Sequence, residues 1–354
     1  MSVFKSRRGA KSRAVLLAGA AGLSSLALVG ANLSAASASP KAKPAAAVTG
    51  PVVSIGLGEP LSPPEVPQQA PFIAQDLGLF KKYHLKVKID YMPNGLQSEL
   101  GTTANSITLG MAGGSDSLEA AAQGAPIHAV WVTYQKLDLV CIGGPGIKTV
   151  KDLIGKNVGS SGAGGFAQTT MDACLTAGGV KLNQVHEINM TRAEFVPALA
   201  SNRIQAAVFH ADDAYTVLHE IKGATILEKE YQSLPEYWYG SLNVRDGYAK
   251  THPLVVEHTI AALMAADRWM MDPKNNARFI TLAVKDTGES RPAVASAIKF
   301  DRGLGLWNTS CAVNRTSVKF TSDLLHSQGS ITRVPTFSQV YNGAYCQKAM
   351  QLVG

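Results

Sequence analysis

The residue patterns that usually carry catalysis or bind metals are missing from this sequence. Its eight histidines form no H-E-x-x-H motif and no pair at metal-ligand spacing with nearby acids. No G-x-S-x-G nucleophile elbow and no C-x-x-C motif occurs. We therefore expect a protein that binds a ligand, is not an enzyme, and uses neither a cofactor nor a metal.

Four loops could form a ligand site because each follows a predicted strand and leads into a predicted helix. In open α/β sheets, ligands bind beyond the carboxyl ends of the strands, where such loops lie. The first loop, residues 58–72, is stiffened by prolines and presents Glu59, Gln68 and Phe72.

The second loop ends in Gly113 and Gly114, followed by Ser115 and Asp116. A helix that begins here offers unpaired N–H groups to an anionic or polar ligand, and Ser115 adds a hydroxyl group. Asp116 with Glu119 three residues later also resembles a capping box, so capping is the alternative role of Asp116.

The third loop, residues 160–166, is rich in glycine, which lets a ligand approach the backbone closely. The helix that follows favours an anion at its N-terminus. The residues that we expect at the ligand are Ser161, Gly164, Gly165 and Phe166.

The same segment approximates a dinucleotide-binding fingerprint. Gly162, Gly164 and Ala167 have the fingerprint's spacing, and Glu187 follows later in the chain. A lone match of this kind is weak, and exported proteins rarely handle nicotinamide cofactors. We therefore expect no nucleotide cofactor.

The fourth loop contains His210, Asp212 and Asp213. His210 could donate a hydrogen bond to a ligand, and Asp212 could accept one from an amine. The alternative role of both aspartates is to cap the next helix.

Aromatic residues flank the predicted passages between the two halves of the fold. Tyr134 lies near the first passage, and Tyr237, Trp238 and Tyr239 lie near the second. Tyr134 and Tyr239 are our candidates for stacking on a ligand ring, and hinge packing is the alternative for these aromatic residues.

The charges of these loops restrict the ligand. Lys136 is the only basic residue in them. The acids are Glu59, Glu65, Asp116, Asp212 and Asp213. Helix ends suit a sulfonate, nitrate or carboxylate, whereas the acids suit an amine, so a zwitterion or a neutral heterocycle would satisfy both.

Length and charge exclude other classes of protein. The chain has 354 residues, of which 46% are hydrophobic, enough for about two packed domains. The net charge is +7, but residues 1–38 hold five basic residues and no acid, so the remainder carries +2. A nearly neutral protein lacks the positive charge that binding to the phosphates of a nucleic acid requires.

The N-terminus has the pattern of a signal peptide. A basic segment precedes an apolar run over residues 14–31, and Ala36-Ser37-Ala38 is a cleavage site of the A-x-A type. The alternative to cleavage is an uncleaved membrane anchor, and the alternative export route is the twin-arginine pathway. We expect cleavage near Ala38, then a flexible leader over residues 39–50.

The first cysteine is Cys141, so no cysteine near the cleavage site could carry a lipid anchor. We therefore expect a periplasmic protein that is not a lipoprotein.

Short strands alternate with helices from residue 51 onward. Strands are predicted over residues 51–57, 85–91 and 106–111, with a helix over residues 72–83. A second strand–helix series begins near residue 139, and the chain is helical after residue 244. This pattern predicts an α/β fold with largely parallel sheets.

Several segments resemble one known family. Residues 71–87, PFIAQDLGLFKKYHLKV, are similar to the opening A-x-x-x-G-x-F-x-K…L-x-V of periplasmic solute-binding proteins of ABC importers that bind nitrate, taurine, aliphatic sulfonates or thiamine pyrimidines. Residues 147–156, IKTVKDLIGK, resemble the family's I-K-T-x-x-D-L-K-G-K. Residues 199–207 and 255–273 resemble later family segments in the same order.

The sequence departs from the family's pattern at two places, and the second, in a predicted ligand loop, weakens the transfer of a ligand from the family without affecting the fold. Asn202, Arg203 and Gln205 stand where the family usually has glycine and aspartate. His210-Ala211-Asp212 replaces an aromatic-acid-proline segment that is usual in the sulfonate binders.

The resemblance implies a two-lobed periplasmic-binding-protein fold of type II, with mainly parallel sheets and two crossover strands near residues 134–139 and 239–244. Residues 51–138 would form the first part of lobe 1, residues 139–240 lobe 2, and residues 241–354 the helical C-terminal part of lobe 1. The ligand would be trapped between the lobes by hinge closure.

The four cysteines are then expected to pair, if at all, within a lobe. Cys311 with Cys346 is our candidate disulfide. Cys141 with Cys174 is the other pair, but Cys141 sits in an apolar strand, where a buried free thiol is common.

The resemblance also implies the function. The protein would be a monomeric solute-binding component that delivers a solute to a membrane permease with a separate ATPase subunit. We expect a sulfonate-, taurine- or nitrate-like solute. The alternatives are a thiamine-precursor pyrimidine or other heterocycle, or a role in sensing a ligand for a membrane signalling partner.

Overall fold

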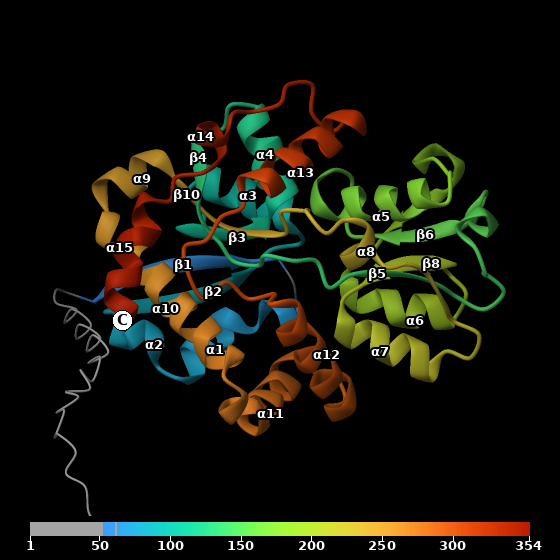
Figure 1. Cartoon of the computed structure of the whole chain (residues 1–354), viewed down its shortest axis with the longest axis horizontal. Helices are drawn as coiled ribbons and strands as arrows, with labels where there is room; N and C mark the ends of the chain where they lie inside the picture. The colour runs from blue at the N-terminus through green and yellow to red at the C-terminus, as the bar shows by residue number, and fades with distance from the viewer. Residues whose placement is uncertain (1–51, 61) are drawn as a thin grey trace, which may run out of the picture. The chain divides into compact units, whose positions relative to one another are not determined.

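Two five-stranded sheets organise the residues that the computed structural model describes, which are 52–60 and 62–354. The predicted signal peptide and leader lie outside the described residues. The strands are ordered β2-β1-β3-β10-β4 in the first sheet and β7-β6-β8-β5-β9 in the second. We call the part built on the first sheet lobe 1 and the part built on the second sheet lobe 2 (Figure 1).

The strands of the first sheet are β1 (Val53–Glu59), β2 (Leu85–Tyr91), β3 (Leu109–Gly113), β4 (Ile127–Val132) and β10 (Gly240–Arg245). Those of the second sheet are β5 (Val140–Gly143), β6 (Asn157–Ser160), β7 (His186–Asn189), β8 (Ala206–Phe209) and β9 (Thr225–Glu228). Each sheet is mainly parallel, but β10 and β5 run antiparallel to both of their neighbours. The two sheets are therefore mixed.

The helices of lobe 1 before the first crossing are α1 (Ala70–Asp76), α2 (Leu79–Lys82), α3 (Gly95–Thr103) and α4 (Gly114–Ala122). Lobe 2 contains α5 (Gly165–Ala177), α6 (Phe195–Ala200), α7 (Ala211–Glu220) and α8 (Glu230–Ser233). The C-terminal helices are α9 (Asp246–Thr251), α10 (Pro253–Met271), α11 (Asn276–Thr287), α12 (Arg291–Leu304), α13 (Arg315–Ser327), α14 (Phe337–Val340) and α15 (Ala344–Val353). None of the helices in the described part of the chain is long and apolar enough to cross a membrane.

The helix predicted over residues 72–83 is two helices, α1 and α2. Gly78 separates them with a φ of 68°, a left-handed conformation that glycine adopts readily and that stops the first helix. The strand predicted at residues 106–111 starts later, at Leu109, and ends at Gly113. The loop after this strand is therefore shorter than expected, and α4 begins directly at Gly114.

The chain passes between the sheets twice. Residues 133–139 connect β4 to β5, close to the predicted first crossover. The return lies within residues 234–239, because Gly240 already pairs with Gly113 in the first sheet. The second crossover expected over residues 239–244 is therefore placed a few residues too late.

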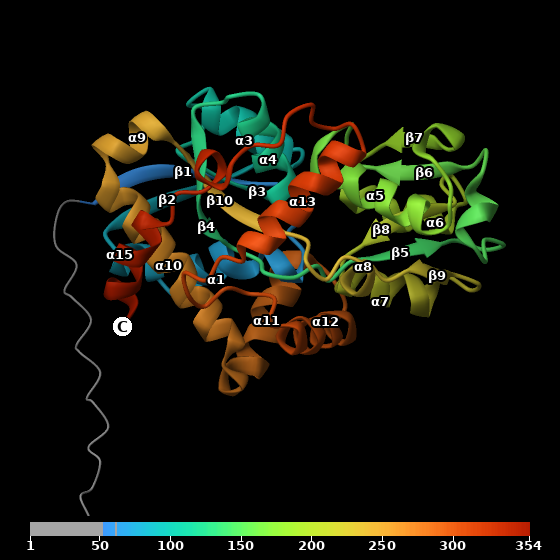
Figure 2. The ribbon, with the colours of Figure 1, turned by 45° about the horizontal axis from the view of Figure 1, so that its top comes forward.

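The C-terminal helices pack mostly on lobe 1. Pro253 is the first residue of α10, whose Val256, Ile260 and Leu263 are fully buried. Farther along the chain, α12 packs on α7 of lobe 2 (Figure 2). Beside this contact the Thr216 hydroxyl group donates to Glu289 Oε2 at 2.7 Å, so lobe 2 is in contact with the C-terminal third.

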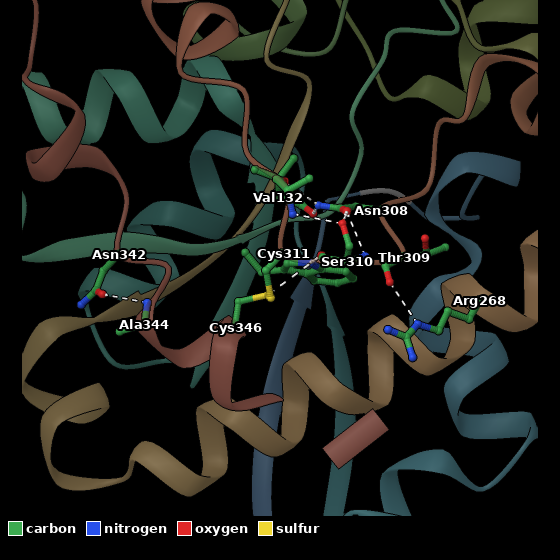
Figure 3. Close-up of a disulfide and its surroundings, with 11 residues drawn as sticks. Val132, Arg268, Asn308, Thr309, Ser310, Cys311, Asn342, Ala344 and Cys346 are labelled. Carbon is green, nitrogen blue, oxygen red and sulfur yellow. Dashed lines mark hydrogen bonds between the residues drawn. A yellow bond between two sulfur atoms is a disulfide. The ribbon is translucent and has the colours of Figure 1, made fainter. Parts of the chain in front are cut away.

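Both cysteine pairs form disulfides. The predicted Cys311–Cys346 bridge ties the loop after α12 to α15, next to Ser310 and Asn308 (Figure 3). Cys141 is bonded to Cys174, so the expectation of a buried free thiol is wrong. Helix α5 packs against the second sheet. The Cα atoms of Cys141 and Cys174 are therefore 6.1 Å apart, within the range that a disulfide spans.

Candidate functional site

A cavity of about 70 Å³ lies between the two sheets and is lined by both lobes and both crossovers. Room for one water is on the order of 10–15 Å³ on this measure, so the cavity holds a small chemical group without further opening. Eight of the predicted site residues line it: Glu59, Gln68, Tyr134, Ser161, Gly164, Phe166, His210 and Tyr239.

The other five predicted residues lie outside the lining. Phe72 stacks on Tyr91 at 6.2 Å, away from the cavity. Gly114 packs against Trp238 so closely that a Cβ would overlap its carbonyl oxygen, and Ser115 is fully buried in the first turn of α4. The remaining two, Gly165 and Asp212, bond to residues of lobe 1 instead.

The N-terminus of α5 faces α4 across the cavity. The Gly165 N–H group donates to Glu119 Oε1 at 3.0 Å, and the Phe166 N–H group donates to Asp116 Oδ1 at 3.0 Å. The Gly164 N–H group donates to the side chain of Gln168. The first N–H groups of this helix, which we expected to meet a ligand anion, are therefore bonded to side chains of the chain itself.

The predicted capping box of α4 is only half correct. Asp116 caps its own helix, because Oδ2 accepts from the Gly113 N–H group at 2.8 Å. Glu119 takes no part in that cap and accepts a hydrogen bond from the Gly165 N–H group of lobe 2. The reason is position: Gly113 is the N-cap residue, so Asp116 occupies the third helical position and Glu119 the sixth.

Burial changes the protonation of the acids around α4. It raises the pKa of Asp116 to about 6 and that of Glu119 to about 7. Glu99 of α3 accepts a hydrogen bond from the Ser117 hydroxyl group of α4, and burial raises the pKa of Glu99 to about 8. Desolvation favours the uncharged acid more than these hydrogen bonds favour the carboxylate.

A second set of polar bonds joins the lobes on the other side of the cavity. The Arg192 guanidinium donates through Nη2 to Glu65 Oε1 at 3.1 Å and through Nη1 to the Val208 carbonyl oxygen at 2.7 Å. The Val66 N–H group donates to Asp212 Oδ2 at 2.8 Å. Glu65 and Val66 belong to lobe 1, and their partners belong to lobe 2.

His210 lies between two carboxylates. Its Nδ1 is 2.7 Å from Asp138 Oδ1, and its Nε2 is 3.2 Å from Glu65 Oε2. Burial by itself lowers the pKa of His210, but the two carboxylates outweigh burial and raise it above the usual value. Both ring nitrogens therefore lie beside carboxylate oxygens, an arrangement that favours the protonated ring.

The aspartates after His210 do not cap α7. His210 is the N-cap residue, and the Ala211 N–H group donates to Asp138 Oδ2 at 3.1 Å. Asp138 comes from the first crossover, so the cap of this helix is supplied by a distant segment. Asp212 is fully buried and bonds to Val66, away from the cavity lining.

Aromatic rings form one wall of the cavity. Phe166 stacks on Tyr239 with centroids 5.1 Å apart and an angle of 15° between the rings. Tyr134 lies 5.1 Å from Tyr239, and the two come from different crossovers. Tyr237 and Trp238 are buried outside the lining, in agreement with hinge packing.

Arg192 and Asn94 line the cavity from outside the four predicted loops. Arg192 lies between β7 and α6, and Asn94 caps α3 while its Nδ2 donates to the Ser161 carbonyl oxygen at 3.0 Å. Both follow carboxyl ends of strands, β7 and β2. Applying the strand-end rule to these two loops as well would have identified them.

All four cysteines are in disulfides, so no thiol is available as a nucleophile. Within residues 52–60 and 62–354, no group of three His, Cys, Asp or Glu side chains is arranged to hold a metal ion. The arrangement can enclose and hydrogen-bond a small molecule.

These features define a two-lobed α/β protein with the periplasmic-binding-protein fold. Its sequence matches the family described as NMT1/THI5 like over residues 67–277, so the chain belongs to this family. No curated protein sequence matches the chain.

Solved structures with the same fold cover most of the chain. The alkanesulfonate-binding protein SsuA from Xanthomonas axonopodis pv. citri, bound to MOPS, is 18% identical with a TM-score of 0.67, over 83% of this chain and 100% of that one. The periplasmic aliphatic sulphonate binding protein SsuA from Escherichia coli is 19% identical with a TM-score of 0.63, over 81% and 91%. The periplasmic nitrate-binding protein NrtA from Synechocystis PCC 6803 is 12% identical with a TM-score of 0.66, over 85% and 89%.

Proposed function

We propose that this protein is the exported solute-binding component of an ABC importer, which captures a small solute between its lobes and delivers it to a membrane permease. The observation that carries this proposal is the cavity itself, which takes lining residues from lobe 1, lobe 2 and both crossovers. A site divided in this way is complete only when the lobes close, so binding and closure are coupled.

Two classes of solute are compatible with this proposal. The structural neighbours that bind alkanesulfonate, aliphatic sulphonate or nitrate favour an oxyanion, including a taurine-like one. The aromatic wall and the acids of this cavity favour a heterocycle, such as a thiamine-precursor pyrimidine, or another solute with amine groups.

The test combines ligand identification with a blocked cavity. We expect native mass spectrometry of the protein from its own host to show a releasable small molecule. Ala167 lines the cavity on α5, so Ala167→Trp should fill the space and abolish this binding, whereas Ala177→Trp at the exposed end of the same helix should not.

Small-angle scattering completes the test. Adding the identified solute to the emptied protein should reduce the radius of gyration, because the lobes close on it. A solute that stays bound to Ala167→Trp, or one that leaves the radius of gyration unchanged, would contradict capture in this cavity.

A further inference from the structure

The N-terminus of α5 is the place where this fold offers N–H groups to an anion, and here the chain's own acids occupy it. Glu119 Oε1 accepts from Gly165, and Asp116 Oδ1 accepts from Phe166, each at 3.0 Å. Both acids come from α4 of the opposite lobe and both are buried. An anion at this helix end would therefore lose these N–H donors and would also face two carboxylates.

The basic groups of the lining do not compensate for these acids. Arg192 is bonded to Glu65, and His210 lies between Glu65 and Asp138. Among the described residues that line the cavity, these are the two basic side chains, and each is matched by at least one carboxylate. A bound oxyanion would thus find no uncompensated positive charge.

Unsatisfied atoms in the lining point instead to hydrogen-bond donors on the solute. Gln68 is 4% exposed, and its Oε1 has no hydrogen-bond partner in the described part of the chain, while its Nε2 donates to Tyr239 Oη at 3.3 Å. Tyr134 is 5% exposed, and its Oη is likewise without a partner there, but a hydroxyl group can both donate and accept. The Gln68 amide oxygen can only accept, so a solute that satisfies it must supply a hydrogen-bond donor such as an N–H group.

We propose that Asp116 and Glu119 determine specificity by closing the α5 N-terminus to anions, so that the solute is a neutral or cationic molecule recognised through its N–H groups. This inference rests on the proposed function and narrows it to one class of solute. It places the oxyanions named for the structural neighbours outside the range of this protein.

Glu119 is the better residue to test, because Asp116 also caps its own helix and its loss would disturb α4. Glu119→Ala frees the Gly165 N–H group and removes one charge, whereas Glu119→Gln removes the charge and keeps a hydrogen-bond acceptor. The matched control is Glu289→Ala, which removes an acid from another contact between the lobes, at Thr216.

The experiment is calorimetric titration of the emptied protein with ethanesulfonate and with nitrate, above the pKa of Glu119. We expect no measurable binding to the wild type or to Glu289→Ala. Glu119→Ala should gain binding of ethanesulfonate by at least about tenfold, with a smaller gain for Glu119→Gln.

Two outcomes would overturn the inference. One is that the wild type binds either anion as tightly as Glu119→Ala does. The other is that no variant gains anion binding although circular dichroism shows native folding. Neither outcome bears on the capture of the native solute, which the blocked-cavity test decides separately.

Discussion

Single charged residues hold the two lobes together. Arg192 and His210 of lobe 2 both contact Glu65 of lobe 1; His210 and Glu65 are buried, and the Arg192 side chain is 15% exposed. A buried charge is tolerated only while its partner remains, because its desolvation is costly. The effect of a substitution here therefore depends on which charge is left behind.

Arg192→Met tests this dependence. It removes one of the two cations that neutralise Glu65, so we expect the free energy of unfolding to fall by about 3–5 kcal/mol. The double variant Arg192→Met/Glu65→Gln leaves no unpaired carboxylate at this position and should regain part of the loss. Urea unfolding followed by circular dichroism measures both, and equal stability of the single and double variants would contradict the pairing.

At the scale of elements, α5 decides how the cavity closes. Its N-terminus meets α4 through Gly165 and Phe166, and its interior is anchored to β5 by the Cys141–Cys174 disulfide. Glycine is needed at residue 165 for two reasons: the φ of 66° and the closeness of Asp116. Some substitutions in α5 should therefore weaken lobe closure and solute binding without an additional loss of folding stability.

Gly165→Ala should weaken closure, because a Cβ there would overlap Asp116 Oδ1. Gly179→Ala is the matched control: it has a φ of 74° and so a similar backbone strain, but no atom lies close to the added Cβ. We expect both variants to lose similar stability, about 1–2 kcal/mol, and only Gly165→Ala to lose solute binding. Equal solute affinity in the two variants, measured by calorimetry, would argue against this role of Gly165.

Removing the bridge between α5 and β5 should cost stability throughout lobe 2. The disulfide closes a loop with a sequence separation of 33 residues, so Cys141→Ala/Cys174→Ala should lower the free energy of unfolding by about 4 kcal/mol through the greater entropy of the unfolded chain. Thermal and urea unfolding of the oxidised wild type and of this variant provide the measurement. An unchanged midpoint would show that the bridge does not stabilise the lobe.

For the whole molecule, we expect closure of the lobes to be coupled to protons. In this structure α5 of lobe 2 contacts Asp116 and Glu119, and burial raises their pKa values to about 6 and about 7. When the lobes separate, the two acids return to water, where their ordinary pKa values are about 4. The closed form therefore binds protons more tightly than the open form does.

It follows that acid should favour closure. Between about pH 8 and about pH 5, the protonated acids make closure of the solute-free protein easier, and the raised pKa of His210 acts in the same direction. We expect a smaller radius of gyration at the acid end of this range, measured by small-angle scattering, and a weaker change in Glu119→Gln. Expansion of the wild type on acidification would contradict this linkage.

Much of the fold follows from local sequence patterns. The alternation of strands and helices, the apolar stripe of α10 and the family segments around residues 71–87 and 147–156 predict an α/β protein with two lobes. These features depend on residues that are close in sequence, because hydrophobic periodicity and capping act within a few residues. The four ligand loops were predictable for the same reason, since each lies at the end of a strand.

Contacts across the lobes were not predictable in this way. Asp116 and Glu119 read locally as a helix cap, and only the approach of α5 shows that Glu119 bonds to a residue 46 positions away. Likewise, nothing near Arg192 in the sequence indicates its partner, because Glu65 is 127 positions away. The sequence by itself determined the two lobes and the loops that face each other, whereas the tertiary structure decided which charges meet in the cavity, because that pairing depends on distances between segments that no local pattern encodes.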